Sequence, residues 1–244
     1  MTLKNIFIIS TNRADYGLLQ ILMKKFSQIK KYNLLVIRLC NNKESYSKDR
    51  ININWDELEI FYSASSFDLK STLNGLLDIE NSFKDLIFEY DPKLVFVLGD
   101  RYELLPIVSQ SLLANIKIAH ISGGEITLGV IDDKVRNMVS FASTIHLVAH
   151  KEAKDRLEFL LGKKYSPNIH VVGEPGLEEI KNTKLKSIDE LSKIYKLDLS
   201  QKFLLCTLHP ETNNKNFYED ASIFFHKLLE IDAKYPLLIS FGNH

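Results

Sequence analysis

The chain alternates short apolar segments with amphipathic segments, and this alternation limits the folds open to it. "LVFVLG", at residues 94–99, is a continuous apolar run between turn signals, as expected of a parallel strand covered on both faces. The other expected strands are "IFIIS", "LLVIRLC", "IKIAHI", "IHLVA" and "IHVVG", at 6–10, 34–40, 116–121, 145–149 and 169–173. Helices are expected over 16–29, 71–90, 102–114, from 132 onward and over 151–161. The pattern predicts an α/β fold with a Rossmann-like, doubly wound parallel sheet.

The pattern breaks at residues 181–201, which are charged and only weakly apolar, and which we interpret as a connector with one helix. Residues 1–180 are therefore expected to form an N-terminal Rossmann-like domain. Residues 202–244 repeat the pattern once, with strand "FLLCTL", a helix over 217–234 and strand "LLISFG". One βαβ unit cannot cover both faces of a sheet, so 202–244 is expected to be the first βαβ unit of a second, incomplete domain. The polar stretch 41–55 is expected to be a mobile excursion.

Composition restricts the partners and the compartment. Lys plus Arg and Asp plus Glu number 31 each, so no net charge favours nucleic acid or an anionic membrane. No apolar run approaches the roughly 20 residues of a membrane span, and the N-terminal run is too short for a signal peptide. Cys40 and Cys206 lie in apolar runs and are expected to be buried and reduced. We expect a cytoplasmic protein that binds neither nucleic acid nor membrane.

Polar residues follow several of the expected strands. Ligands of open parallel sheets bind outside the carboxyl ends of the strands. Arg13 follows the first strand, Asp100 and Arg101 follow "LVFVLG", and His209 follows the first strand of the second unit. Arginine beside the free N–H groups of a helix start suits a diphosphate. The sequence therefore predicts an anion-binding site at this edge of the sheet.

The segment "HISGGEITLGVIDDKVRN", residues 120–137, combines a glycine turn with three carboxylates. Gly123 and Gly124 permit a positive φ angle and a close approach of ligand to backbone. Glu125 follows them in mid-loop with no evident capping role, so a functional interpretation leads. For Asp132 the favoured interpretation is an N-cap, and for Asp133 the structural alternative is a favourable interaction with the helix dipole.

The other candidates have structural alternatives of similar weight. Asp100 is as well explained by a helix cap as by catalysis, and His209 by a structural role as by ligand contact. Arg136 would ordinarily be a surface or salt-bridge residue. Glu103 and Glu211 are interpreted as first-turn helix residues, and His146 and His170 as structural. Walker, G-x-G-x-x-G, G-x-S-x-G and zinc-binding patterns are absent from the sequence.

Taken in order, "NRADYGLL", "GDRYELLP", "AHISGGEITLGVIDDKVRN", "VVGEPGLEEI" and "LHPET" resemble the hydrolysing UDP-N-acetylglucosamine 2-epimerase family. The similarity runs from about Ile6 to the C-terminus and is greatest for the branch that serves sialic, legionaminic and related nonulosonic acid synthesis. The chain departs from the family pattern at Thr11-Asn12, where a glycine usually stands, and at Ser122 and Asn137, where histidines usually stand.

The resemblance implies a two-domain GT-B architecture with the site in the interdomain cleft. It implies cleavage of a UDP-2-acetamido sugar, either UDP-GlcNAc or a 4-amino-4,6-dideoxy derivative, to UDP and the 2-epimeric free sugar. The reaction is an elimination followed by hydration, without NAD, metal or any other cofactor. Homodimers are common in the family.

Matched by motif, the family's acid/base carboxylates fall on Asp100, Glu125 and Asp133, and its histidine near the phosphates falls on His209. The arginine that faces the diphosphate falls on Arg13. The remaining expected substrate-binding residues are Arg101, Gly123, Gly124 and Arg136. Clustered carboxylates suit removal of a C2 proton, because like charges raise one another's pKa. The base is left open between Glu125 and Asp133, with Asp100 favoured as the partner of water or the leaving group.

Two rival hypotheses remain. Family members continue for another hundred-odd residues with further nucleotide contacts, so the chain is interpreted as truncated in its second domain and is expected to be weak or inactive alone. It could then be an inactive remnant or interaction module with the same fold. A glycosyltransferase of the same architecture is disfavoured, because the acidic triad matches the epimerases.

Overall fold

The computed structural model describes residues 3–41, 55–65, 68–128, 130–208, 216–232 and 235–240. The chain divides into two compact units, Met1–Asn182 and Thr183–His244, which are described separately. Among the described residues, no helix is long and apolar enough to cross a membrane.

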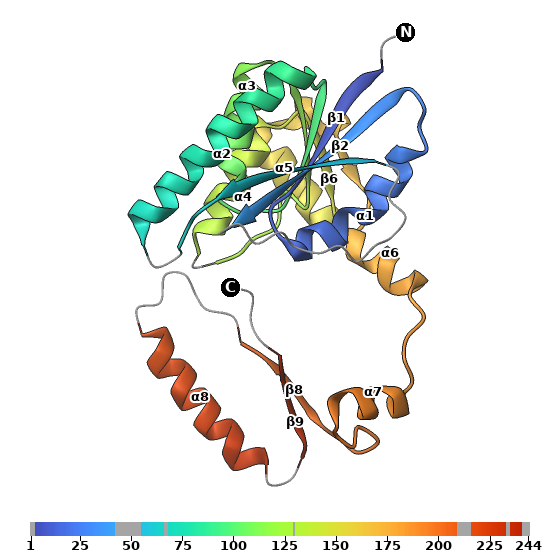
Figure 1. The fold of residues 1–244 in the computed structure, drawn as a ribbon, viewed down its shortest axis with the longest axis vertical. Helices are drawn as coiled ribbons and strands as arrows, with labels where there is room; N and C mark the ends of the chain where they lie inside the picture. The colour runs from blue at the N-terminus through green and yellow to red at the C-terminus, as the bar shows by residue number, and fades with distance from the viewer. Residues whose placement is uncertain are drawn as a thin grey trace. The chain divides into compact units, whose positions relative to one another are not determined.

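The first unit is a parallel sheet of seven strands in the order β3-β2-β1-β4-β5-β6-β7 (Figure 1). The strands are β1 (Lys4–Ser10), β2 (Tyr32–Asn41), β3 (Asp56–Tyr62), β4 (Leu94–Leu98), β5 (Lys117–Ile121), β6 (Ile145–Val148) and β7 (Ile169–Val171). The helices are α1 (Arg13–Ser27), α2 (Leu69–Tyr90), α3 (Leu104–Leu113), α4 (Ile131–Ala142), α5 (Lys151–Leu161), the 3-10 helix η1 (Lys163–Asn168) and α6 (Pro175–Asn182). The predicted Rossmann-like, doubly wound fold is confirmed.

Both faces of the sheet are buried, which explains the continuous apolar strands. Phe7 and Ile9 of β1 pack into a core with α2, α3 and α4, whereas Ile6 and Ile8 pack into a second core with α1. Successive side chains of a strand point to opposite faces, so a strand between two helical layers is apolar at every position.

The strand order places the carboxyl ends of β1 and β4 at a topological switch point. The chain runs from β1 outward to β2 in one direction and from β4 outward to β5 in the other. The connecting helices therefore lie on opposite faces of the sheet, and open α/β sheets bind their ligands at such a switch point. The segments that begin at Thr11 and Gly99 border this point.

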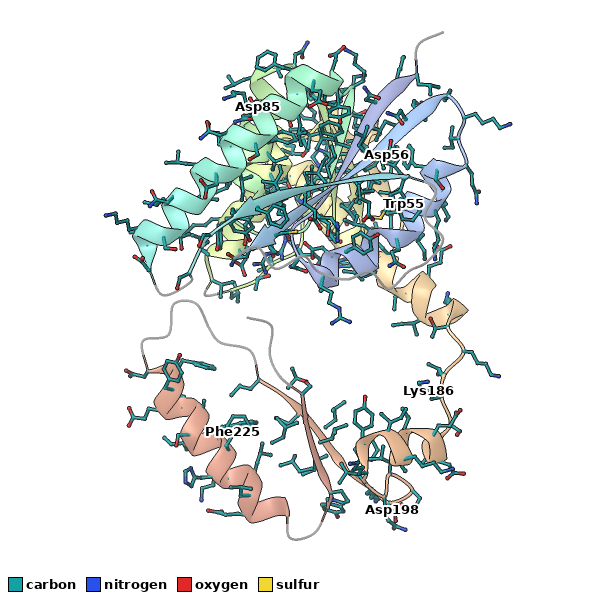
Figure 2. The ribbon with its side chains drawn as sticks, in the orientation of Figure 1. Trp55, Asp56, Asp85, Lys186, Asp198 and Phe225 are labelled. Carbon is teal, nitrogen blue, oxygen red and sulfur yellow. The ribbon has the colours of Figure 1, made fainter. Side chains whose placement is uncertain are left out.

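Edge strand β3 is absent from the sequence-based prediction. Its residues Glu57 and Glu59 are charged, but both lie beside the buried Arg38 of β2. Arg38 Nε lies 3.5 Å from Glu57 Oε2, and Trp55 Nε1 donates to Glu57 Oε1 at 3.1 Å (Figure 2 labels Trp55). Polar residues are thus accommodated within the sheet by an arginine on the neighbouring strand.

The second unit contains α7 (Ile188–Tyr195), β8 (Leu204–Thr207), α8 (Phe217–Asp232) and β9 (Leu237–Ser240). β8 and β9 pair in parallel, as expected of one βαβ unit. The expectation that both cysteines are buried is wrong for Cys206, which is partly exposed, and right for Cys40. Apolar side chains of this two-stranded sheet remain exposed as well, among them Leu205 of β8 and Ile239 of β9. The exact division into domain and connector segments stays a prediction.

Candidate functional site

Asp100 and Arg136 form the centre of the site. β4 ends at Leu98, and Gly99 continues with a φ of 75° while its N–H donates to Ile121 O at 3.0 Å. Asp100 follows and forms an ion pair with Arg136 Nη2 from α4. The two side chains are 23% and 9% exposed. Burial, together with nearby Arg156, lowers the pKa of Arg136, so the adjacent carboxylate offsets an otherwise unfavourable buried charge.

A single threonine links this ion pair to Asp133. Arg136 Nη1 donates to Thr127 Oγ1 at 3.0 Å, and Thr127 N–H donates to Asp133 Oδ1 at 3.1 Å. Asn137 Nδ2 lies 3.4 Å from Asp133 Oδ2, one turn along the same helix. Asp100, Arg136, Thr127 and Asp133 therefore form one network, called here the Asp100–Asp133 network.

Two sequence-based interpretations of these carboxylates need correction. Asp132 is not an N-cap: α4 begins at Ile131, with Val130 in the cap position. Asp132 and Asp133 both lie in the first turn, where a carboxylate interacts favourably with the helix dipole. Asp100 does not cap the next helix either, because α3 begins only at Leu104. The ion pair with Arg136 accounts for its position.

Gly123 and Gly124 pack where a side chain would collide. A Cβ at Gly123 would lie 2.8 Å from Nδ1 of the buried His120 and 3.0 Å from Ser140 Oγ. At Gly124, with a φ of 80°, it would lie 2.5 Å from Ala153 O. Arg156 Nη1 donates to Gly124 O, which fixes the turn to α5. Close packing therefore explains why glycine stands at both positions, without any contact with a substrate. Their contact with substrate stays a prediction.

Glu125 follows this turn and contacts the first turn of α5. Its Oε1 lies 2.9 Å from His150 Nε2, and His150 is the N-cap residue of α5. Ala153 N–H donates to His150 Nδ1 at 3.2 Å. Glu125 therefore has a defined partner of its own, separate from the Asp100–Asp133 network.

Arg101 belongs to a third group of contacts at the switch point. Its Nη2 lies 3.0 Å from Glu103 Oε1, which also accepts a hydrogen bond from Tyr62 OH at 3.1 Å. Burial disfavours the charge on Arg101, but Glu103 outweighs that effect and raises the pKa of the guanidinium. Burial raises the pKa of Tyr62, and the negative charge of Glu103 adds to it.

Glu103 and Asp15 interact with Arg101 but are not among the site residues predicted from the sequence. Glu103 is almost wholly buried and occupies the N-cap position of α3 without a side-chain capping bond, so its interpretation as a first-turn residue is wrong. Asp15 accepts a hydrogen bond from the Thr11 hydroxyl, and burial raises its pKa while the Thr11 hydrogen bond and Arg101 oppose that shift. Asp15 lies within "NRADYGLL", one of the segments that resemble the epimerase family, and this was the only sequence feature that could have indicated its place in the site.

The remaining predicted residues are placed as follows. Arg13 is exposed as the first residue of α1, directly after the capping Asn12. His209 and Glu211 fall outside the described residues. Within the described ranges, no group of three or more His, Cys, Asp or Glu side chains could hold a metal ion.

Comparison with known proteins identifies the fold family. The family model for UDP-N-acetylglucosamine 2-epimerase matches residues 49–244. The chain belongs to the UDP-N-acetylglucosamine 2-epimerase family. Among the relatives of this epimerase-family chain is the GDP/UDP-N,N'-diacetylbacillosamine 2-epimerase (hydrolyzing) of Campylobacter jejuni, 30% identical over 93% of this chain and 60% of the relative. Another is the UDP-N-acetylglucosamine 2-epimerase of Neisseria meningitidis, 27% identical over 95% of this chain and 61% of the relative.

Solved structures of the epimerases share the fold. The Neisseria meningitidis UDP-GlcNAc 2-epimerase bound to UDP-GlcNAc has a TM-score of 0.75 at 16% identity, covering 97% of this chain and 66% of that one. The Methanocaldococcus jannaschii enzyme in complex with UDP-GlcNAc and UDP has a TM-score of 0.72 at 17% identity, with the same coverage of 97% and 66%. The chain thus spans about 60% of the length of the curated relatives it matches.

Proposed function

We propose that the protein is a hydrolysing 2-epimerase that acts on a UDP-2-acetamido sugar, either UDP-GlcNAc or a 4-amino-4,6-dideoxy derivative, for sialic or legionaminic-type sugar synthesis. The observation that carries the proposal is the Asp100–Asp133 network, in which a buried arginine binds one carboxylate directly and is linked to the second through Thr127, beside the carboxyl edge of the sheet. Relatives named as hydrolyzing 2-epimerases support the reaction type. A relative named as a polysialic acid biosynthesis protein supports the biosynthetic role.

The proposed reaction needs groups that exchange protons at C2 and at the anomeric oxygen. In the first step a carboxylate takes the C2 proton, the C1–O bond to UDP breaks and a C1=C2 double bond forms. In the second step water adds its oxygen to C1, and C2 is reprotonated on the opposite face. The products are UDP and the 2-epimeric sugar, so one water is consumed and no redox cofactor is needed.

The proposed roles are those that the family resemblance implies for each residue. Glu125 or Asp133 is the C2 base, and Asp100 serves the leaving group or the water. Arg13 and His209 stabilise the charge that develops on the departing UDP. Arg101, Gly123 and Gly124 line the sugar-nucleotide site, and Arg136 acts through Asp100, with which it is paired.

Substitution of Glu125 tests the proposal. Glu125→Gln removes a proton-accepting carboxylate without changing the size of the side chain. In the complete protein we expect the rate of UDP release, measured with a coupled assay, to fall at least about 100-fold, as is typical when a general base is lost. The exposed Glu89→Gln on α2 is the matched control and should keep the full rate. Unchanged release in Glu125→Gln would remove this residue from the chemistry.

The ligand and assembly parts of the proposal have their own test. The nucleotide sugar is the proposed ligand, the cytoplasm the proposed compartment and a homodimer the proposed assembly. NMR of the sugar released from each candidate nucleotide sugar would identify the substrate, and light scattering would give the mass of the assembly. A released sugar with unchanged C2 configuration would contradict epimerisation.

A further inference from the structure

His150 lies beside the proposed catalytic carboxylate but has no role in the chemistry derived so far. Its imidazole lies between two glutamates, with Nε2 2.9 Å from Glu125 Oε1 and Nδ1 2.9 Å from Glu152 Oε2. The Glu125 and His150 side chains are 33% and 46% exposed, whereas that of Glu152 is 76% exposed. Glu125 is therefore the more enclosed of the two neighbours.

Helix capping determines which ring nitrogen carries the proton. His150 Nδ1 accepts the Ala153 N–H at 3.2 Å and so satisfies one of the free donors at the start of α5. The Ala153 N–H needs a lone pair on Nδ1, whereas Glu152 Oε2, 2.9 Å from the same nitrogen, would need a proton there. Because Glu152 is 76% exposed and its contact competes with water, we assign Nδ1 to the helix cap, so that the neutral imidazole has its proton on Nε2. In that tautomer Nε2 is the nitrogen that carries a proton beside Glu125 Oε1, which lies 2.9 Å away.

The same helix also fixes the backbone that carries Glu125. Arg156 of α5 donates to Gly124 O, and Gly124 packs so closely that a Cβ there would lie 2.5 Å from Ala153 O. The backbone before Glu125 and the imidazole beside its side chain are thus both held by the first two turns of α5. The Glu125 carboxylate therefore has a neighbour whose position is set by the helix.

We propose that His150 is a positioning residue for Glu125. Its Nε2–H holds Oε1 and leaves Oε2 available for proton exchange with the substrate. This role rests on the proposed function, because it requires Glu125 to exchange a proton. A histidine that only capped α5 would need Nδ1 alone, so the two functions of the ring can be separated by substitution.

The tautomer can be measured without any activity. In a sample labelled with ¹⁵N-histidine at about pH 8, the resonances of His150 are assigned by their absence in His150→Asn. We expect the Nε2–H tautomer in the wild-type chain. An Nδ1–H tautomer would overturn the proposal, because Nε2 could then not donate to Glu125.

Substitutions separate capping from positioning. His150→Asn places an amide oxygen near Nδ1, which preserves the cap, but it lacks a donor that reaches Glu125. We expect kcat to fall about tenfold, with KM within about twofold and an unchanged melting temperature. His150→Gln carries an N–H₂ group about as far out as Nε2 and should recover part of kcat. Glu152→Gln is the control and should leave kcat unchanged.

A double substitution tests whether His150 acts through Glu125. We expect Glu125→Gln/His150→Asn to be no slower than Glu125→Gln alone, since a positioning residue has no effect once its target is lost. A further tenfold loss in the double variant, or full kcat in His150→Asn, would overturn the positioning role. A complete wild-type protein that releases no UDP, or a fully active Glu125→Gln, would instead overturn the proposed function and the positioning role with it, whatever the tautomer.

Discussion

Arg136 carries a charge that the fold has largely removed from water, and two of its nitrogens are bound within the site. One binds Asp100 after β4, and the other binds Thr127 in the loop that leads to Asp133. From the sequence, the structural alternative for Arg136 is an ordinary surface or salt-bridge role. Its neighbours are 9 and 36 positions away, so no local pattern could reveal them. The planar guanidinium suits this role because its donors point in fixed directions.

Replacing Arg136 with lysine should show how much this geometry matters. Lysine keeps the positive charge, but a single ammonium group cannot reproduce the fixed donor directions that serve Asp100 and Thr127 together. We expect the free energy of unfolding in urea to fall by about 1–3 kcal/mol. Lys134→Arg, the reverse exchange at an exposed position of α4, should change it by less than about 0.5 kcal/mol. An equal effect of both exchanges would contradict the proposed role of the guanidinium.

Elements with strong local signals were predicted well. Buried parallel strands are apolar at every position, so β4, β5 and β6 were located within one or two residues, and α5 was located at its observed bounds. β3 was missed because its glutamates are explained only by Arg38 on β2. Glu103 was misinterpreted for the same reason, since its partner Tyr62 lies 41 positions earlier. Local composition predicts elements, whereas paired buried charges depend on contacts between distant segments.

The end of α2 offers a test at the scale of one element. Asp91 is its C-cap residue and has a φ of 44°, a left-handed conformation that glycine adopts without strain. We expect Asp91→Gly to raise the free energy of unfolding by about 0.5 kcal/mol, because relief of strain outweighs the loss of an exposed ion pair with Lys93. Asp85→Gly within the same helix (Figure 2) should lower it by about 0.5–1 kcal/mol. Two changes of the same sign in thermal or urea unfolding would refute the conformational argument.

At the scale of the whole molecule, two histidines buried side by side in the sheet should make stability depend on pH. His120 and His146 are register partners on β5 and β6. Burial lowers the pKa of each to about 4, and in His120 a hydrogen bond to Gly99 O opposes the shift. Among the described residues, the ring of His146 has no hydrogen-bond partner. Both side chains are therefore neutral in the folded state at pH 7.

Acidification should destabilise the fold through these groups. Between their folded pKa of about 4 and the ordinary value of 6.5, the unfolded chain binds more protons than the folded chain, so stability falls as pH falls. From pH 7 to 5.5 we expect a loss of about 1 kcal/mol for each histidine. His146→Leu should remove about half of this dependence in urea titrations at several pH values. A slope that is the same in the variant and the wild type would show that His146 does not titrate in this range.

Asp133 is held at both of its oxygens, one by the backbone of Thr127 and the other by Asn137. A carboxylate restrained in this way cannot turn to follow a moving partner. A sugar that exchanges a proton with it must bring the hydrogen to a fixed lone pair, along one line of approach. Under the proposed function, the stereochemistry of the product would be decided by how the sugar ring lies against this carboxylate, and a poorly placed substrate would fail to react rather than yield the wrong isomer.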